Sequence, residues 1–298
     1  MCRDEEARMS IRNDLKRSIV LFLKNHRGGS YSTQADRRYI LLQAANDLVS
    51  LGYGLRDING LKQKHVLAIV QSWQDKGLSN STIKNRTAIL RNLCEGLKKS
   101  TLVPSNDQLQ IGKRKYVSTI NRAQHNPNFE KVSDPYIKIS LELQRVFGLR
   151  REESLKIKPH QADKGNRLEL FPTWCKGGRG RTILIRTDEQ RYWLDQAKVL
   201  AGKFGNSLIP QKKNYFQQRC LYDKQVNRAG LRNLHGLRHA YAQNRYKELT
   251  GWEAPINGGP KSRELSKEQK QIDYKARMIL TEELGHSREA ITVNYCGR

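Results

Sequence analysis

The sequence predicts a mainly α-helical protein with a small antiparallel β-sheet, an α+β fold in two domains. Apolar residues recur at helical spacing through most of the chain. Residues 167–186 differ, because two runs of strand character there flank a glycine-rich turn. The 298 residues also reach the size at which a single hydrophobic core stops growing, about 250 to 300 residues, so two domains are expected.

The N-terminal part predicts a helical domain behind a flexible arm. Residues 1–10 are polar and charged, which favours a loose arm. Glycine pairs and Ser or Thr caps separate the apolar runs that follow. The helices expected in this domain, residues 11–102, cover 11–27, 33–51, 62–75 and 79–97.

A change of composition predicts a linker and then a second domain. Residues 98–128 are polar and basic, and residues 103–116 are the expected core of the linker. Residues 117–298 form the expected second domain. Its strand-like segments are 155–158, 167–175 and 181–186, with Lys176 at the hairpin tip, and its helices are 136–146, 188–201, 211–229, 237–249, 263–284 and one after Ser287.

The charge balance predicts a polyanionic partner. The chain has 55 Lys and Arg against 29 Asp and Glu, a net charge of +26, with 18 basic against 10 acidic residues before position 111. A basic excess in both domains suits nucleic acid, because each neutralised phosphate releases counterions. The alternatives are a merely soluble basic protein or one attracted to anionic membrane. No apolar run approaches the roughly 20 residues of a spanning helix, and no signal peptide opens the chain.

The five cysteines predict reduced thiols in a cytoplasm. They are odd in number, scattered and without a C-x-x-C pair, which argues against disulfides and a zinc site. The chain also lacks a Walker loop, a dinucleotide-binding glycine motif and a carboxylate cluster for magnesium, so no metal or cofactor is expected. The pairs Glu152-Glu153 and Glu282-Glu283 are expected on helix surfaces.

The segment from His235 to His239 predicts an anion site. If a helix begins there, His235 and Arg238 share one face. Arg offers a planar fork of donors to phosphate, and His can exchange a proton near neutral pH. The alternative is a helix start with a capping His and an Arg that extends to water.

Six residues of the second domain carry a resemblance to a known family. Each motif alone is weak, but together and in this order they resemble the tyrosine recombinases, or phage-type integrases. The matching segments are Gly148-Leu149-Arg150 with Glu153, Lys176 followed by Arg181, His235-x-x-Arg238-His239, and Leu284-Gly285-His286 nine residues before Tyr295. The resemblance implies a tyrosine-recombinase catalytic domain and a helical, SAM-like core-binding domain at residues 11–102.

The chemistry of DNA cleavage assigns a role to each residue type. Arg150 and Arg238 could neutralise the phosphate oxygens by bidentate hydrogen bonds. Tyr295 must lose a proton as it attacks, and His235 is the first choice of base. The resemblance implies that Lys176 protonates the leaving 5′ oxygen and that His286 hydrogen-bonds the phosphate. Glu153 is expected to orient an arginine; His239 and Arg181 are further supporting residues.

Further cations are candidates for contact with the DNA backbone. Each alone is most simply a solvated surface charge, but several together favour a face that contacts phosphates. They are Arg37, Arg38, Lys62, Lys64, Lys84, Arg86 and Arg91 in the first domain and Arg179 in the second.

The leading hypothesis is a site-specific DNA recombinase or integrase of a bacterial mobile element. It would cut double-stranded DNA through a 3′-phosphotyrosine intermediate, for integration or excision, without metal or ATP. The resemblance implies a free monomer and a homo-tetramer on two duplexes, with accessory DNA-bending or directionality proteins open. The alternatives are a type IB topoisomerase-like nicking-closing enzyme and a catalytically idle DNA-binding accessory protein.

The chain departs from the family in two places. Residues 251–277 form an expected insertion, either a surface excursion or a contact to DNA or a neighbouring protomer. Few residues follow Tyr295, so the insertion or the last helix is expected to replace the tail that couples protomers in relatives; a truncated copy is the other possibility.

Overall fold

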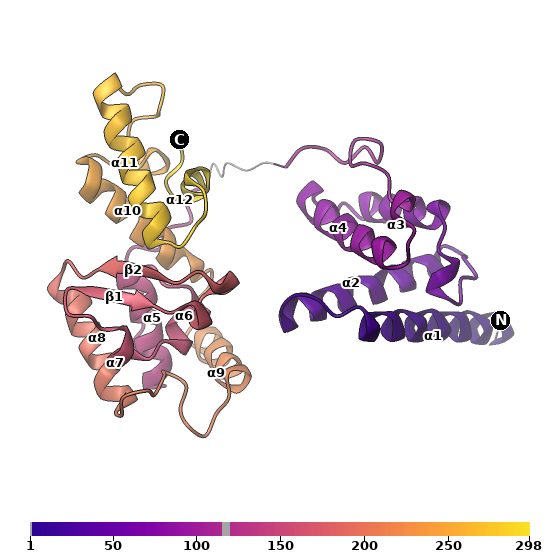
Figure 1. The fold of residues 1–298 in the computed structure, drawn as a ribbon, viewed down its shortest axis with the longest axis horizontal. Coiled ribbons are helices and arrows are strands. Elements are labelled where there is room, and N and C mark those ends of the chain that lie inside the picture. Colours follow the sequence, from indigo (N-terminus) through magenta and orange to yellow (C-terminus); the bar gives the residue numbers. More distant parts are fainter. Residues whose placement is uncertain (1, 115–119) are drawn as a thin grey trace. The chain divides into compact units, whose positions relative to one another are not determined.

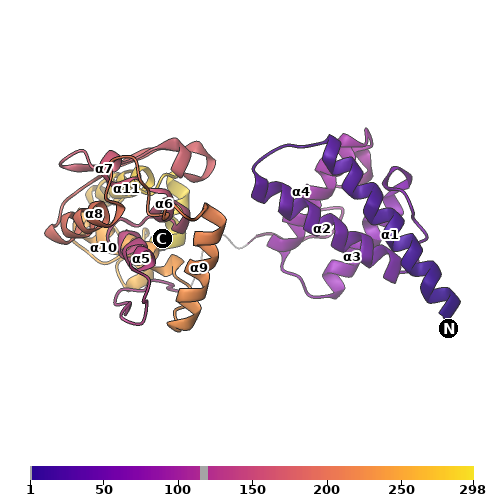
Figure 2. The same ribbon diagram turned by 90° about the horizontal axis from the view of Figure 1, so that it is seen from below.

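The computed structural model describes residues 2–114 and 120–298, and the chain divides into two compact units, residues 1–115 and 116–298. The first unit is helical (Figures 1 and 2). Its helices are α1 (Cys2–Asn25), α2 (Tyr31–Ser50), α3 (Gln63–Asp75) and α4 (Asn80–Gly96). They bury one apolar core, in which Leu15, Leu48, Trp73 and Leu90 are at most 2% exposed. Ser30 and Ser79 cap α2 and α4 by accepting from the N–H groups of Thr33 and Thr82.

The prediction of a flexible arm at residues 1–10 is wrong, because helix α1 begins at Cys2. Residues 5–10 are exposed, as their polarity predicts. Glu5 and Glu6 lie in the first turns, where negative charge favours a helix N-terminus. Solvated polar residues can therefore extend a helix that Leu15 and Ile19 anchor in the core.

The expected linker core, residues 103–116, is largely part of the first unit. Val103, Leu109 and Ile111 are buried in its core. Arg91 Nη2 donates to the Pro104 carbonyl at 2.8 Å and to Asn106 Oδ1 at 3.1 Å, which holds the segment on α4. Widely spaced apolar residues among polar ones concealed this packing in the sequence. Residues 115 and 116 of the expected linker lie outside the described residues.

The second unit places a two-stranded sheet against helices. The antiparallel strands β1 (Arg167–Leu170) and β2 (Arg181–Leu184) pair Leu170 with Arg181. Helix α5 is almost wholly buried and packs on α6, α8 and α10. The α-helices of this unit are α5 (Pro135–Phe147), α6 (Arg151–Lys156), α7 (Pro159–Ala162), α8 (Asp188–Ala201), α9 (Tyr215–Arg228), α10 (His235–Thr250), α11 (Lys267–Glu283) and α12 (Val293–Cys296).

Two expected strand segments differ from the structure. Residues 155–158 are not a strand, because α6 runs to Lys156. The hairpin strands end at Leu170 and begin again at Arg181, because Pro172 starts a 3₁₀ turn and a second one covers Lys176–Gly178. Lys176 therefore lies within an irregular ten-residue connection, residues 171–180, rather than at the tip of long strands.

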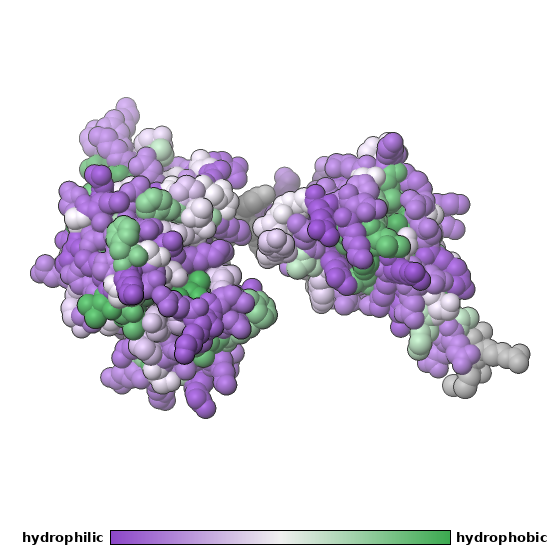
Figure 3. Space-filling view, turned by 60° about the horizontal axis from the view of Figure 1, so that its bottom comes forward, coloured by the Kyte–Doolittle hydropathy of each residue, from purple (hydrophilic) through white to green (hydrophobic). Residues whose placement is uncertain are grey.

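The surface agrees with the charge of the chain. The face in Figure 3 is mainly hydrophilic on both units, with small apolar patches. Among the described residues, no helix is both long and apolar enough to cross a membrane.

Candidate active site around Tyr295

The guanidinium of Arg238 is the centre of the site. Arg238 lies in the first turn of α10 and is 1% exposed. Its Nη1 donates to the Gly148 carbonyl at 2.5 Å, and its Nη2 donates to the Leu284 carbonyl. Burial lowers its pKa to about 10, and Arg150 and Arg181 add to this effect. The side chain is thus fixed by the backbone of two distant segments and remains charged near neutral pH.

Arg150, at the start of α6, binds the same Leu284 carbonyl as Arg238. It follows Gly148, which ends α5 in a left-handed conformation at φ 61°. A Cβ at Gly148 would lie 2.5 Å from the Tyr241 ring, so only glycine fits this turn. Arg150 Nη1 donates to Glu153 at 2.7 Å and Nη2 donates to the Leu284 carbonyl at 3.2 Å.

A buried carboxylate holds two of the arginines. Glu153 is fully buried and accepts two hydrogen bonds from Arg181, at 3.0 and 2.7 Å, besides that from Arg150. Burial alone would raise the pKa of Glu153, but the hydrogen bonds and positive charge of Arg181, with Arg238 and Arg150, lower it to about 2. Glu153 is therefore charged. The expected position of Glu153 on a helix surface is wrong, because the side chain is buried. Its contacts with Arg150 and Arg181 are those of a residue that orients arginines, as expected.

The end of α11 supplies a backbone acceptor and a second buried carboxylate. The Leu284 carbonyl accepts from both Arg150 and Arg238. Glu283, expected on the surface, is 5% exposed; it accepts from Tyr241 at 2.8 Å and from Arg245 at 3.1 Å. The expectation failed because the pairing partners lie on α10, far away in the sequence.

Tyr295 lies in α12 with its hydroxyl against Arg238 and His286. The residue is 5% exposed. Arg238 Nε donates to the hydroxyl at 3.4 Å, and His286 Nε2 lies 3.2 Å from it. Gln243, which the sequence analysis missed, donates to the Tyr295 carbonyl at 2.9 Å. Its position one helical turn after His239 was the available signal.

The tautomer of His286 follows from its neighbours. Arg238 Nη2 lies 3.5 Å from His286 Nε2, and a guanidinium can only donate. Nε2 is therefore the unprotonated acceptor, and the Tyr295 hydroxyl donates to it. Burial lowers the pKa of His286 to about 3, and the charges of Arg238, Arg150 and Arg181 add to this effect.

The other two histidines surround the phenol ring. The ring centroid of Tyr295 lies 4.7 Å from His239 and 6.0 Å from His235. Burial lowers the pKa of His239 to about 4, and its buried Nδ1 has no hydrogen-bond partner among the described residues. Burial, with Arg238 and Arg150, also lowers the pKa of His235. His235 is closer to solvent and contacts the ring rather than the hydroxyl.

Lys176 is not brought into contact with this group. It is exposed, as is Arg179 in the same connection. Within the ranges that the structure describes, Lys176 has no hydrogen bond or ion pair. The sulfur of its neighbour Cys175 lies 3.7 Å from Arg181 Nη1. The connection that carries Lys176 therefore contacts the site at Arg181.

The candidate DNA-contacting cations of the first unit differ in their surroundings. Arg37 donates to the Gly28 carbonyl at 3.0 Å, and Arg91 is bound to residues 104 and 106, so both stabilise the fold. Arg86 lies over the Trp73 ring and Lys64 over the Tyr53 ring. Arg38 and Lys62 are exposed and Lys84 is half-buried.

Residues 251–277 pack in part on α10 and beside Tyr295, although most of residues 257–272 are exposed. Trp252 Nε1 donates to the Tyr246 hydroxyl at 3.3 Å, and that hydroxyl donates to Asp273 at 2.5 Å. Arg277, 1% exposed, pairs with Asp273 at 2.8 Å. A Cβ at Gly297 would lie 2.9 Å from the Ile256 backbone, so this segment also contacts the chain beyond Tyr295.

Comparison with known proteins places this fold. A model of the phage integrase N-terminal domain matches residues 13–102, and an integrase model matches residues 108–244. A lambda integrase dimer bound to a COC' core site has a TM-score of 0.58 at 15% identity, over 92% of this chain and 75% of that one. The Tn1549 transposon integrase with a circular intermediate DNA has 0.54 at 13%, over 97% and 95%.

The XerH site-specific recombinase, bound to a palindromic difH substrate, has a TM-score of 0.52 at 17% identity, over 92% of this chain and 78% of that one. No curated protein matches the sequence. The fold is that of recombinases with a helical N-terminal domain and a mixed catalytic domain. With the two family models, which follow each other along the chain, it identifies this protein as a member of the phage-type integrases, the tyrosine recombinases.

Proposed function

We propose that this protein is a site-specific DNA recombinase that cleaves and rejoins DNA strands through Tyr295. The observation that carries the proposal is the contact of the Tyr295 hydroxyl with Arg238, at 3.4 Å, beside the Arg150 guanidinium. Preorganised guanidinium donors stabilise the charge that develops on phosphate oxygens during attack. A phenol within reach of such donors can become the nucleophile.

The reaction exchanges one phosphodiester for another. The Tyr295 oxygen forms a bond to phosphorus, and the bond from phosphorus to the 5′ oxygen breaks. Arg150 and Arg238 bind the non-bridging oxygens, and Lys176 donates a proton to the leaving 5′ oxygen. The products are a 3′-phosphotyrosine and a 5′ hydroxyl. A second 5′ hydroxyl reverses the step, so the energy of the phosphodiester is kept in the protein–DNA bond.

In this proposal His286 takes the phenol proton once the negative charge of the bound phosphate offsets the arginines that lower the pKa of His286. It is the imidazole whose unprotonated Nε2 lies 3.2 Å from the Tyr295 hydroxyl, whereas His235 contacts only the ring. A general base must lie within about 2.6–3.2 Å of the proton donor's heavy atom. Arg238 Nε, at 3.4 Å, stabilises the phenolate that forms. His235 then remains free to donate to the phosphate.

The substrate is double-stranded DNA in a synaptic assembly. A lambda integrase tetramer binds a Holliday junction, and similarity to it supports a homo-tetramer on DNA. The proposal adds that the tetramer holds two duplexes and that the free protein is a monomer. The likeness to a transposon integrase supports integration or excision of a mobile element. The proposal places this activity in the cytoplasm of a bacterium. Residues 251–277 are proposed to support α12 and thereby the coupling of protomers.

Covalent capture tests the proposal. The protein is incubated with sheared, nicked genomic DNA, denatured, and the DNA that remains attached is sequenced. The expected result is an adduct at one recurrent sequence with wild-type protein and none with Tyr295→Phe. No adduct with any DNA would support an idle binding protein. Relaxation of any supercoiled plasmid without strand exchange would support a nicking-closing enzyme instead.

A further inference from the structure

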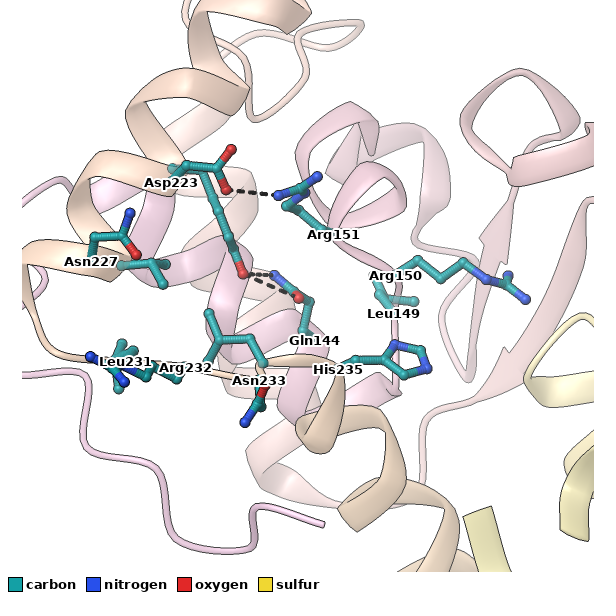
Figure 4. A pocket seen from close by; sticks show the side chains of 13 residues that line it. Gln144, Leu149, Arg150, Arg151, Asp223, Asn227, Leu231, Arg232, Asn233 and His235 are labelled. Atoms are coloured by element: carbon teal, nitrogen blue, oxygen red, sulfur yellow. Dashed lines mark hydrogen bonds and ion pairs between the residues drawn. The ribbon is translucent and has the colours of Figure 1, made fainter. Parts of the chain in front are cut away.

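A cavity of about 770 Å³ opens beside Arg150 and His235 in the second unit. Figure 4 shows these two side chains pointing the same way at one end, while Arg151 and Asp223 lie on another side, beside α9. We propose that this cavity binds the phosphate next to the scissile phosphate on the cleaved DNA strand, with Arg232 and Arg151 as its ligands. The inference rests on the proposed function and adds a second phosphate subsite to it.

The charge of the lining favours an anion. Three arginines and a histidine line the cavity, and Asp223 is the single carboxylate among the described lining residues. Asp223 pairs with Arg151 at 2.8 Å, and both side chains are about half exposed, at 51% and 41%. Such an exposed pair is weak, so a phosphate can replace Asp223 on Arg151 without a large loss.

The two proposed ligands are neighbours in the sequence of the residues that face the scissile phosphate. Arg151 directly follows Arg150, and Arg232 precedes His235 by three residues. Successive phosphates of one strand are displaced by about 3.4 Å along the helix axis. If Arg150 and His235 meet the scissile phosphate, Arg151 and Arg232, which line the same cavity, are the cations that the next phosphate of the strand can reach.

The loop that carries Arg232 is already fixed without DNA. Gln124 Nε2 donates to the Arg232 carbonyl at 2.7 Å, and Gly236 N–H donates to the Asn233 carbonyl at 2.7 Å. Asn233 has φ 54°, a left-handed conformation that asparagine tolerates. A Cβ at Gly236 would lie 2.4 Å from the Arg122 carbonyl, so the loop packs tightly there. A preordered loop loses little entropy when it binds a ligand.

The walls of the cavity suit the sugar that joins two phosphates. Leu149, Val226 and Leu234 supply apolar surface. Two polar residues of the lining bind each other, because Gln144 Nε2 donates to the Tyr222 hydroxyl at 3.1 Å. The deoxyribose can therefore pack on the apolar surface while its phosphates meet the arginines.

The first test measures binding without cleavage, with a labelled 40-base-pair duplex of arbitrary sequence and proteins that all carry Tyr295→Phe. Arg232→Ala is expected to reduce the slope of log K against log salt by about 1. Asp223→Asn is expected to tighten binding about two- to fivefold, because it removes the carboxylate that competes with phosphate. The matched control is Arg228→Ala, an exposed arginine of α9 outside the cavity. An equal effect of Arg228→Ala would reduce the proposal to general surface charge and overturn it.

The second test locates the phosphate. It uses the DNA sequence that the wild-type protein captures through Tyr295, and it measures binding of that duplex to Tyr295→Phe protein. A neutral methylphosphonate replaces the phosphate on either side of the scissile one. At one of these two positions, the methylphosphonate is expected to weaken DNA binding by the protein that retains Arg232. At the same position it should not weaken DNA binding by the Arg232→Ala protein any further. Additive effects at both positions would overturn the inference, whereas absence of any Tyr295 adduct would instead contradict the proposed function.

Discussion

The region around Tyr295 and the connection that carries Lys176 are assigned to one reaction in the proposed function, but they differ in structure. Arg238 and Tyr295 are at most 5% exposed, and hydrogen bonds join them before any DNA is present. Lys176 lies in an exposed connection and makes no polar contact with the described part of the protein. In the proposed function, the fold therefore builds the Tyr295 half of the site by itself, and the Lys176 half is completed when substrate binds.

The two halves of the site are also expected to contribute differently to the stability of the fold. Groups that bind each other in a buried site stabilise the fold as well as the transition state, so their loss changes both. A solvated lysine contributes to catalysis without contributing to folding. The two halves can therefore be separated by measuring cleavage and unfolding in the same variants.

Arg238→Ala is expected to have the largest effect on both measurements. Adduct formation should fall more than about 10³-fold, because several donors to the phosphate and the phenol disappear. The free energy of unfolding should fall by about 2–4 kcal/mol, because the buried Gly148 carbonyl loses the Arg238 donor and the Leu284 carbonyl keeps only that from Arg150. Single-turnover capture and urea unfolding measure the two. Arg150→Ala is the matched control, with a similar loss of cleavage but a smaller loss of stability, since its side chain is 23% exposed.

Lys176→Ala is expected to slow adduct formation about 10²–10⁴-fold, the range for a general acid. Stability should change by less than about 0.5 kcal/mol, because the side chain is solvated. A substrate with sulfur in place of the 5′ bridging oxygen should restore the rate, since a thiolate leaves without a proton. A large loss of stability, or no rescue by sulfur, would contradict the contrast between the two regions.

His286→Ala should slow adduct formation about 10²-fold, at the low end for a general base because Arg238 still stabilises the phenolate. Replacing Tyr295 by 3,5-difluorotyrosine, whose phenol is more acidic, should recover most of this loss. His235→Ala is the control, and its defect should not respond to the fluorinated residue. Rescue of His235→Ala instead would return the role of base to His235.

The smallest expected effect is on stability at low pH. The pKa values of His286 and His239 are lowered to about 3 and about 4, below the usual 6.5. Between pH 6.5 and 4 the unfolded chain therefore binds more protons, so stability should fall as the pH is lowered from 7 to 5. His239→Gln should make urea unfolding less dependent on pH in this window. An unchanged dependence would contradict a neutral, buried His239.

Much of the fold followed from local patterns, because helix periodicity and serine caps act over a few residues. Helices α2, α3 and α4 of the first unit and α5, α8, α9, α10 and α11 of the second lie close to the expected ranges, whereas α1 begins nine residues earlier than expected. The mistakes fall where a distant partner decides. Ile111 is buried by the helices before it, and Glu283 is buried by Tyr241 and Arg245.

The candidate site was predicted from side-chain types in order, and this limited what could be foreseen. Spacing places His235 and Arg238 on one helix face, but it cannot tell which imidazole meets the phenol. That contact depends on how α12 packs against α10, through Gln243 and the chain around Ile256. The sequence analysis expected Glu153 to orient an arginine. It named Arg181 only as a further supporting residue and did not predict that Arg181 pairs with Glu153.

The Leu284 carbonyl has a consequence for how this site can vary. Every amino acid at position 284 presents the same oxygen to Arg150 and Arg238. The link between the two guanidinium groups is therefore invisible to side-chain mutagenesis and insensitive to drift at that position, provided the residue still packs. Chemical synthesis with an ester in place of the peptide bond after Leu284 would weaken this acceptor and expose the link, although it also removes the Gly285 N–H that donates to the Glu282 carbonyl at 2.9 Å.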